Sequence, residues 1–294
     1  MSSGRASALM LVALLAAGCV DQPVGSARPT ATIAPEPTPV SQTYALGTQV
    51  WYEGLVITFD RVTSLLDIRG GTVSLLVGVA NPNEDPAALD GGISLAIGDV
   101  HVDTTRDSAI PEVPGNGSVA TVLTFELQSI ASIDDAVFEV GRAPDHIARV
   151  PVTPAAGKAV TFEPQAFGLK GSGQASTLKV VLKRGLLRWD LPDWTQELNA
   201  NRAVLTVTYD VTYTGDFAGG FAFTGGNVVL KLPDGTVVSA RKDGHSQSVE
   251  LVGAHKTKKG LFSRFEIPSG LTGTFTLLVR SSGVEKSIKF TLGG

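Results

Sequence analysis

The sequence predicts an all-β protein whose folded part consists of two tandem β-sandwiches. The clearest observation is residues 203–214, where apolar and polar side chains alternate with a period of two, as they do in a half-buried strand. Turn-forming sequences such as Pro114-Gly115 and Pro233-Asp234 separate shorter β-rich segments. Many short strands divided by turns are typical of sandwiches and not of strands that alternate with helices. The shorter segments are residues 55–63, 72–80, 93–98, 118–127, 136–140, 178–183, 228–232, 274–279 and 286–292.

The amino-terminal residues 1–18 are predicted to be a lipoprotein signal peptide. Residues 8–17 are apolar, and this length is about half of the roughly 20 residues that a membrane-spanning helix needs. Small residues then precede Cys19, the only cysteine of the chain. This segment resembles the lipobox of bacterial lipoproteins, although the usual Leu three positions before the cysteine is here Ala16. The resemblance implies a lipid attached to Cys19, and the alternative is an ordinary secretory signal with an incidental cysteine.

Residues 19–43 are predicted to be the lipidated cysteine followed by a disordered tether. Prolines recur among Ala, Thr and Ser, and large apolar side chains are scarce, so this segment cannot offset its chain entropy by burial. An O-glycosylated stalk is the alternative for such a composition. The lipid would be the only membrane attachment, because no other segment is long and apolar enough to span a bilayer.

The remaining residues divide into an acidic sandwich at 44–150, a linker at 151–158 and a basic sandwich at 159–294. Residues 44–150 contain 15 acidic and 5 basic side chains, whereas residues 151–294 contain 11 acidic and 17 basic ones. This asymmetry has two interpretations: the two sandwiches attract each other, or the basic one faces an anionic lipid or cell-wall polymer.

The second half also repeats features of the first. Asp99 and Arg106 follow an alternating segment in the first half, and Asp234 and Arg241 follow a similar segment at the same offset. A duplicated domain with loop insertions explains this pattern, and the alternative is that any two sandwiches share turn chemistry.

The first half resembles a known family from Gly47 to Arg142. Its strand ending in Asn81 and the Pro114-Gly115 turn before the strand that ends in Phe125 are similar to those of immunoglobulin-like domains of unknown function in bacterial secreted lipoproteins. These domains are related to the mycobacterial immunoprotective extracellular antigen. The resemblance implies an immunoglobulin-like β-sandwich outside the cytoplasm and supplies no catalytic residues. It covers the second half only loosely.

Two groups of side chains are candidates for contacts with an anionic surface or a glycan. A basic run lies before a predicted strand, and the alternative for it is a solvated turn. A second group carries tryptophans that could stack on sugars or cap the sandwich core. The cationic candidates are Lys183, Arg184, Arg188, Lys256, Lys258 and Lys259, and the aromatic candidates are Trp189 and Trp194.

A proline-rich loop offers the oxygen ligands that Ca²⁺ prefers, although its spacing lacks the order of an EF-hand loop. Asn-Pro and Asp-Pro steps explain a turn there equally well. The sequence therefore predicts no metal and no cofactor, with one candidate calcium set: Asn81, Asn83, Glu84, Asp85 and Asp90.

The sequence favours a non-catalytic binding or adhesion module held on the outer face of the cell membrane, or on a periplasmic membrane face in a Gram-negative cell. The four histidines lack zinc-helix spacing, and no Gly-x-Ser-x-Gly motif occurs. The alternatives are a structural envelope lipoprotein and an enzyme with a cryptic loop site. A protein or an envelope polymer is the expected partner besides the membrane, nucleic acid is not, and the oligomeric state stays open.

Overall fold

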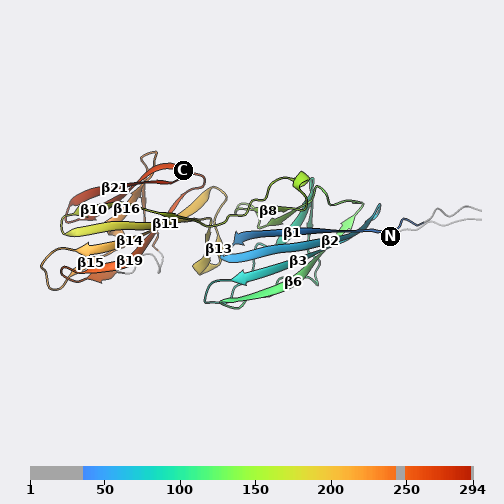
Figure 1. Cartoon of the computed structure of the whole chain (residues 1–294), viewed down its shortest axis with the longest axis horizontal. Coiled ribbons are helices and arrows are strands. Elements are labelled where there is room, and N and C mark those ends of the chain that lie inside the picture. The colour runs from blue at the N-terminus through green and yellow to red at the C-terminus, as the bar shows by residue number, and fades with distance from the viewer. Residues whose placement is uncertain (1–35, 243–248, 293–294) are drawn as a thin grey trace, which may run out of the picture. The chain divides into compact units, whose positions relative to one another are not determined.

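The computed structural model describes residues 36–242 and 249–292, which form antiparallel β-sheets without an α-helix among them (Figure 1). The all-β sandwich class predicted from the sequence is thereby confirmed. The predicted signal peptide, Cys19 and most of the predicted tether lie outside the described residues. Within the described part, no helix has the length and apolar character to cross a membrane.

The first sandwich packs two four-stranded sheets face to face around one core. One sheet has the order β1-β2-β3-β6, and the other has the order β5-β4-β7-β8. Its strands are β1 (Val40–Tyr52), β2 (Leu55–Asp67), β3 (Gly70–Asn81), β4 (Ile93–Ile97), β5 (Val100–Asp103), β6 (Gly117–Gln128), β7 (Val137–Val140) and β8 (Ala148–Pro151).

The second sandwich repeats this arrangement. One sheet has the order β10-β11-β14-β19, with β9 also paired to β11, and the other has the order β17-β16-β20-β21. Two-stranded ribbons, β12–β13 and β15–β18, are added to it. Its strands are β9 (Gln165–Gly168), β10 (Ser172–Ala175), β11 (Leu178–Arg188), β12 (Asp190–Leu191), β13 (Gln196–Glu197), β14 (Arg202–Tyr213), β15 (Phe221–Phe223), β16 (Val228–Lys231), β17 (Val237–Ser239), β18 (Glu250–Val252), β19 (Thr257–Pro268), β20 (Gly273–Ser281) and β21 (Val284–Leu292).

The two sandwiches match in detail as well as in strand order. In the first, the β2–β3 register shifts at Asp60, and in the second the β11–β14 register shifts at Lys183. Each bulge precedes an exposed arginine, Arg61 or Arg184. A β-bulge redirects the side chains that follow it, so these two arginines occupy equivalent places in the two sandwiches.

Each sandwich has its own hydrophobic core. In the first, the Phe138 ring lies 5.9 Å from that of Phe59 and 5.7 Å from that of Phe125, and all three are fully buried. In the second, the buried Tyr209 hydroxyl lies 2.6 Å from the Ser263 hydroxyl, which satisfies both groups inside the core.

Two predicted boundaries are corrected by the structure. The tether was expected to reach residue 43, but β1 begins at Val40, because Val40 to Ala45 continue the backbone ladder opposite Arg61 to Leu66 despite their exposed side chains. The segment 151–158 is not a free linker, since Val152 is buried in the first core. The chain stays on the first sandwich as far as Phe162, and the first strand of the second sandwich begins at Gln165.

Candidate functional site

The candidate site is built around a hairpin inserted between β11 and β14. This hairpin, called here the 190–197 hairpin, consists of β12, the single 3₁₀ turn η2 (Pro192–Trp194) and β13. The corresponding connection in the first sandwich is only a tight turn between β2 and β3. Leu191 and Leu198 pack with Val204 of β14 in a small apolar cluster, which holds the hairpin against its own sandwich.

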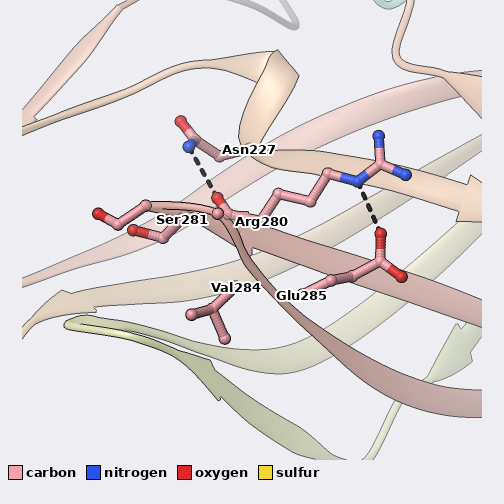
Figure 2. A pocket seen from close by; sticks show the side chains of 7 residues that line it. Asn227, Arg280, Ser281, Val284 and Glu285 are labelled. Carbon is pink, nitrogen blue, oxygen red and sulfur yellow. Dashed lines mark hydrogen bonds and ion pairs between the residues drawn. The ribbon is translucent and has the colours of Figure 1, made fainter.

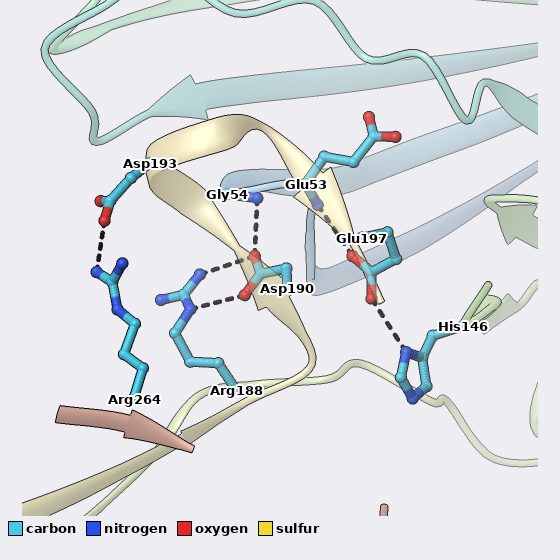
Figure 3. Close-up of polar contacts among 8 residues, drawn as sticks. All are labelled: Glu53, Gly54, His146, Arg188, Asp190, Asp193, Glu197 and Arg264. Carbon is cyan, nitrogen blue, oxygen red and sulfur yellow. Dashed lines mark hydrogen bonds and ion pairs between the residues drawn. The ribbon is translucent and has the colours of Figure 1, made fainter. Parts of the chain in front are cut away.

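One side of the 190–197 hairpin accepts two hydrogen bonds from the β1–β2 turn of the first sandwich (Figure 3). The Gly54 amide donates to Asp190 Oδ2 at 2.7 Å, and the Glu53 amide donates to Glu197 Oε2 at 3.1 Å. Gly54 has φ +80°, and a Cβ at this position would lie 2.7 Å from Pro192 Cα. Only glycine therefore fits this contact without strain.

Buried titratable groups lie in the same contact. Glu197 Oε1 is 3.3 Å from His146 Nδ1, and the two side chains are only 2% and 3% exposed. Burial raises the pKa of Glu197 to about 9 and lowers the pKa of His146. Burial also raises the pKa of Glu53 to about 6. At neutral pH burial therefore favours the neutral forms of both Glu197 and His146.

The other side of the 190–197 hairpin forms one wall of a groove on the outer face of the β11-β14-β19 sheet. Strand register fixes two rows of side chains across this face: Arg184, Thr208 and Phe262 in one row, and Leu186, Thr206 and Arg264 in the next. The groove encloses about 230 Å³. The complete lining is Arg184, Leu186, Arg188, Asp190, Leu191, Pro192, Val204, Thr206, Thr208, Gly260, Phe262 and Arg264.

The three arginines of the groove differ in their partners. Arg188 makes a bidentate pair with Asp190, through Nε at 2.6 Å and Nη2 at 2.8 Å. Arg264 pairs with Asp193 and lies between two rings, 5.5 Å from the centre of Trp194 and 5.3 Å from that of Phe262. Within the described part of the chain, Arg184 forms no ion pair and is exposed. Two of the charges are thus compensated internally, and the third remains for a ligand.

The structure distributes the predicted cationic residues over two places. Arg184 and Arg188 line the groove, and Lys183, at the bulge beside it, pairs with Asp210 at 3.1 Å. Lys258 and Lys259 lie at the beginning of β19, where Lys258 pairs with Glu250, and Lys256 lies in the turn just before this strand.

The two predicted aromatic candidates have different environments. For Trp189 the structure corrects the prediction of a glycan contact. Its Nε1 donates to Ser269 Oγ at 3.2 Å, and its ring packs on the second core, with its centre 5.7 Å from the centre of the Phe162 ring. It therefore caps the sandwich, because a large aromatic ring gains more from packing than from exposure. Trp194 is 39% exposed and stacks on Arg264 at the groove.

The candidate calcium loop is also corrected. Asn81 is buried, and its amide side chain ties the loop together by donating to the carbonyl oxygens of Asp85 and Val113 and accepting from the Asn83 amide. Its oxygen thus already takes part in holding the loop together. In the residues that the structure describes, no group of three or more His, Cys, Asp or Glu side chains could hold a metal ion.

Several site residues were not identified from the sequence. Phe262 and Arg264 reach the groove only because β19 pairs with β14, and Glu53 lies 144 residues from Glu197 in the chain. The one local signal in the sequence is the alternation of polar and apolar side chains from Arg264 to Ile267, since such a strand faces a core on one side.

A second hollow at the β20–β21 turn offers less chemistry (Figure 2). Arg280 Nε donates to Glu285 Oε2 at 2.8 Å, and the Asn227 side chain donates to the Arg280 carbonyl at 2.9 Å. The side chains of Arg280, Glu285 and Asn227 are thus engaged within the turn itself.

Comparisons with known proteins give no family. No family model matches the sequence, and no curated protein matches it. Among the solved structures that match is one described as "The crystal structure of the conserved domain protein from Bacillus anthracis", with 12% sequence identity and a TM-score of 0.25. The match covers 85% of this chain and 90% of that one.

Proposed function

We propose that this chain is a membrane-anchored extracytoplasmic lipoprotein whose folded part is a non-catalytic binding module. The observation that carries the proposal is the groove beside the 190–197 hairpin. It combines an exposed, uncompensated Arg184 with an apolar floor of Leu186, Val204 and Phe262. A ligand with one anionic group and a compact apolar body fits both features.

The fixed geometry of the groove favours binding over catalysis. Asp190 already accepts three hydrogen bonds, two from Arg188 and one from Gly54, so it has little capacity to act as a base. The remaining oxygens of the lining side chains are the hydroxyls of Thr206 and Thr208, neither of which has a base beside it in the lining.

The test uses residues 20–294, which retain every described residue and lack Cys19. Anilinonaphthalene sulfonate serves as the probe, because it carries one sulfonate on an apolar ring system and becomes fluorescent when it leaves water. Arg184→Ala is expected to weaken its binding by about tenfold or more, as the loss of one charged hydrogen bond implies.

Arg61→Ala is the matched control. Arg61 follows the equivalent bulge in the first sandwich and lies in the equivalent row, opposite Leu76 on β3, which in turn faces Val122 on β6. The proposal predicts unchanged probe affinity for this variant. Equal losses in both variants, or none in either, would remove the groove as the binding site.

A further inference from the structure

Asp190 joins the groove to the first sandwich (Figure 3). Its carboxylate lines the groove and accepts two hydrogen bonds from Arg188, which lines the groove as well. The Oδ2 atom is shared, because it lies 2.8 Å from Arg188 Nη2 and also accepts from the Gly54 amide of the first sandwich at 2.7 Å. This carboxylate belongs to a residue that is only 4% exposed. The Gly54 amide therefore helps to fix the Asp190–Arg188 pair in the groove wall.

Direct packing makes a second link between the groove wall and the first sandwich. Pro192 lines the groove, and a Cβ built on Gly54 would lie 2.7 Å from Pro192 Cα and 2.9 Å from Pro192 Cβ. The two residues are therefore in contact and leave no room for a further methyl group between them. Leu191, between Asp190 and Pro192, also lines the groove. These three consecutive wall residues thus contact the first sandwich at both of their ends.

The segment that follows the 190–197 hairpin pairs with the first sandwich through its backbone. The His146 amide donates to the Leu198 carbonyl at 3.1 Å, and the Ala200 amide donates to the Pro144 carbonyl at 3.0 Å. Together with the bonds that the hairpin side chains accept from the β1–β2 turn, these bonds attach the inserted segment to the first sandwich along its length. On its own sandwich the segment is held by the small apolar cluster around Leu191. The position of the groove wall thus depends on both sandwiches.

We infer that the first sandwich positions the groove wall, so that binding of a ligand in the groove and docking of the 190–197 hairpin on the β1–β2 turn stabilise each other. This inference rests on the proposed function. Gly54 is a positioning residue, because it is not part of the groove lining and acts through Asp190 and Pro192. When the hairpin leaves the turn, these two residues lose the contacts that fix them, and a ligand must bear the entropy of ordering the wall. Such coupling acts by the same factor in both directions.

The first experiment follows hydrogen–deuterium exchange of single amides in the unaltered residues 20–294, with and without saturating anilinonaphthalene sulfonate. The Gly54 and Glu53 amides lie outside the groove lining, and each is bonded to the hairpin. Their exchange should slow by about threefold or more when the probe is bound, because a ligand that prefers the docked form shifts the population toward it. The Thr105 amide, bonded to the Thr124 carbonyl within the first sandwich, is the matched control and should exchange at an unchanged rate.

The second experiment measures probe affinity in Gly54→Ala, whose added Cβ pushes the β1–β2 turn away from Pro192 and leaves every groove-lining residue unchanged. Its affinity should fall by about threefold or more, because the docked form that binds the probe is then less populated. Gly78→Ala is the matched control, since its added Cβ meets nothing within 4 Å, and it should bind the probe as the unaltered chain does.

The inference is overturned if the probe slows the Gly54 and Glu53 amides no more than the Thr105 amide, or if folded Gly54→Ala binds the probe as tightly as the unaltered chain. Should Gly54→Ala lose its folded circular dichroism spectrum, the exchange result decides alone. Arg184→Ala separates this inference from the proposed function. Weakened binding in Arg184→Ala together with either of those two results contradicts the coupling alone, whereas unchanged binding in Arg184→Ala removes the groove and the inference with it.

Discussion

Replacement of Glu197 by glutamine should change how the stability of the chain depends on pH. The Glu197 carboxyl is 2% exposed, lies 3.3 Å from His146 Nδ1, and has a pKa raised by burial from 4.5 to about 9. Glutamine has the same shape and cannot ionise. Its carbonyl oxygen can still accept from the Glu53 amide, as the Glu197 carboxyl does.

The expected magnitude follows from the raised pKa. Folded Glu197 keeps a proton that the unfolded chain loses above pH 4.5, so its contribution to stability falls as the pH rises from 4.5 to about 9. Each pH unit in this window costs up to about 1.4 kcal/mol. The lowered pKa of His146 makes the folded chain less stable as the pH falls, but only below the unfolded pKa of 6.5. The raised pKa of Glu53 changes stability only up to its folded pKa of about 6. Between about pH 7 and about pH 8.5 the unaltered chain should therefore lose about 1–2 kcal/mol relative to Glu197→Gln.

The assay is urea denaturation at a series of pH values, followed by circular dichroism and by tryptophan fluorescence. Trp51 reports on the first sandwich, and Trp189 and Trp194 report on the second. Glu126→Gln, an exposed substitution on β6, is the control and should leave the pH dependence unchanged. Parallel stability curves for the unaltered chain and Glu197→Gln across this pH range would refute the buried neutral pair.

Three further predictions concern the first core, the contact between Gly54 and the 190–197 hairpin, and the lipid anchor. Phe138→Ala should lower the free energy of unfolding by about 3–5 kcal/mol, because it removes a fully buried ring between Phe59 and Phe125. In the same denaturant titration, the control Val122→Ala at a half-exposed position should lower it by less than about 1 kcal/mol. Gly54→Ala should destabilise the contact with Asp190 by about 1–3 kcal/mol, since the φ of +80° at Gly54 and the nearby Pro192 both oppose a Cβ. The 190–197 hairpin should then be cleaved more readily in limited proteolysis. In the control Gly78→Ala the new Cβ has open space, so this variant should resist proteolysis as the unaltered chain does. Cys19→Ser should release the protein from the membrane fraction or stall its processing, and a variant still cleaved and membrane-bound would contradict the lipid anchor.

The strands were predictable where the local pattern carries the signal. Residues 203–214 alternate without interruption, because β14 is the central strand of its sheet and buries every second side chain. The beginning of β19 was not predicted as a strand, since Lys258 and Lys259 are solvated and its pairing with β14 supplies the only reason for an extended backbone. β1 was not among the predicted strands, and the predicted tether covered its first residues, because these residues pair with β2 but bury little.

The site was predictable only in part. Arg184, Arg188 and Trp194 were among the cationic and aromatic candidates, and the structure brings them together at one groove. Their partners could not be found in this way. The hydrogen bond from Gly54 to Asp190 joins residues that are 136 positions apart, and no local sequence pattern indicates such a contact.

The most direct test of the proposed groove is a map of backbone amide chemical shifts in residues 20–294 during titration with anilinonaphthalene sulfonate. The proposal predicts that the largest shifts occur at Arg184, Leu186, Thr206, Thr208 and Phe262, with further shifts in the 190–197 hairpin, and that the row of Arg61, Leu76 and Val122 in the first sandwich stays unchanged. Shifts centred on that first-sandwich row, or at the β20–β21 turn, would contradict it.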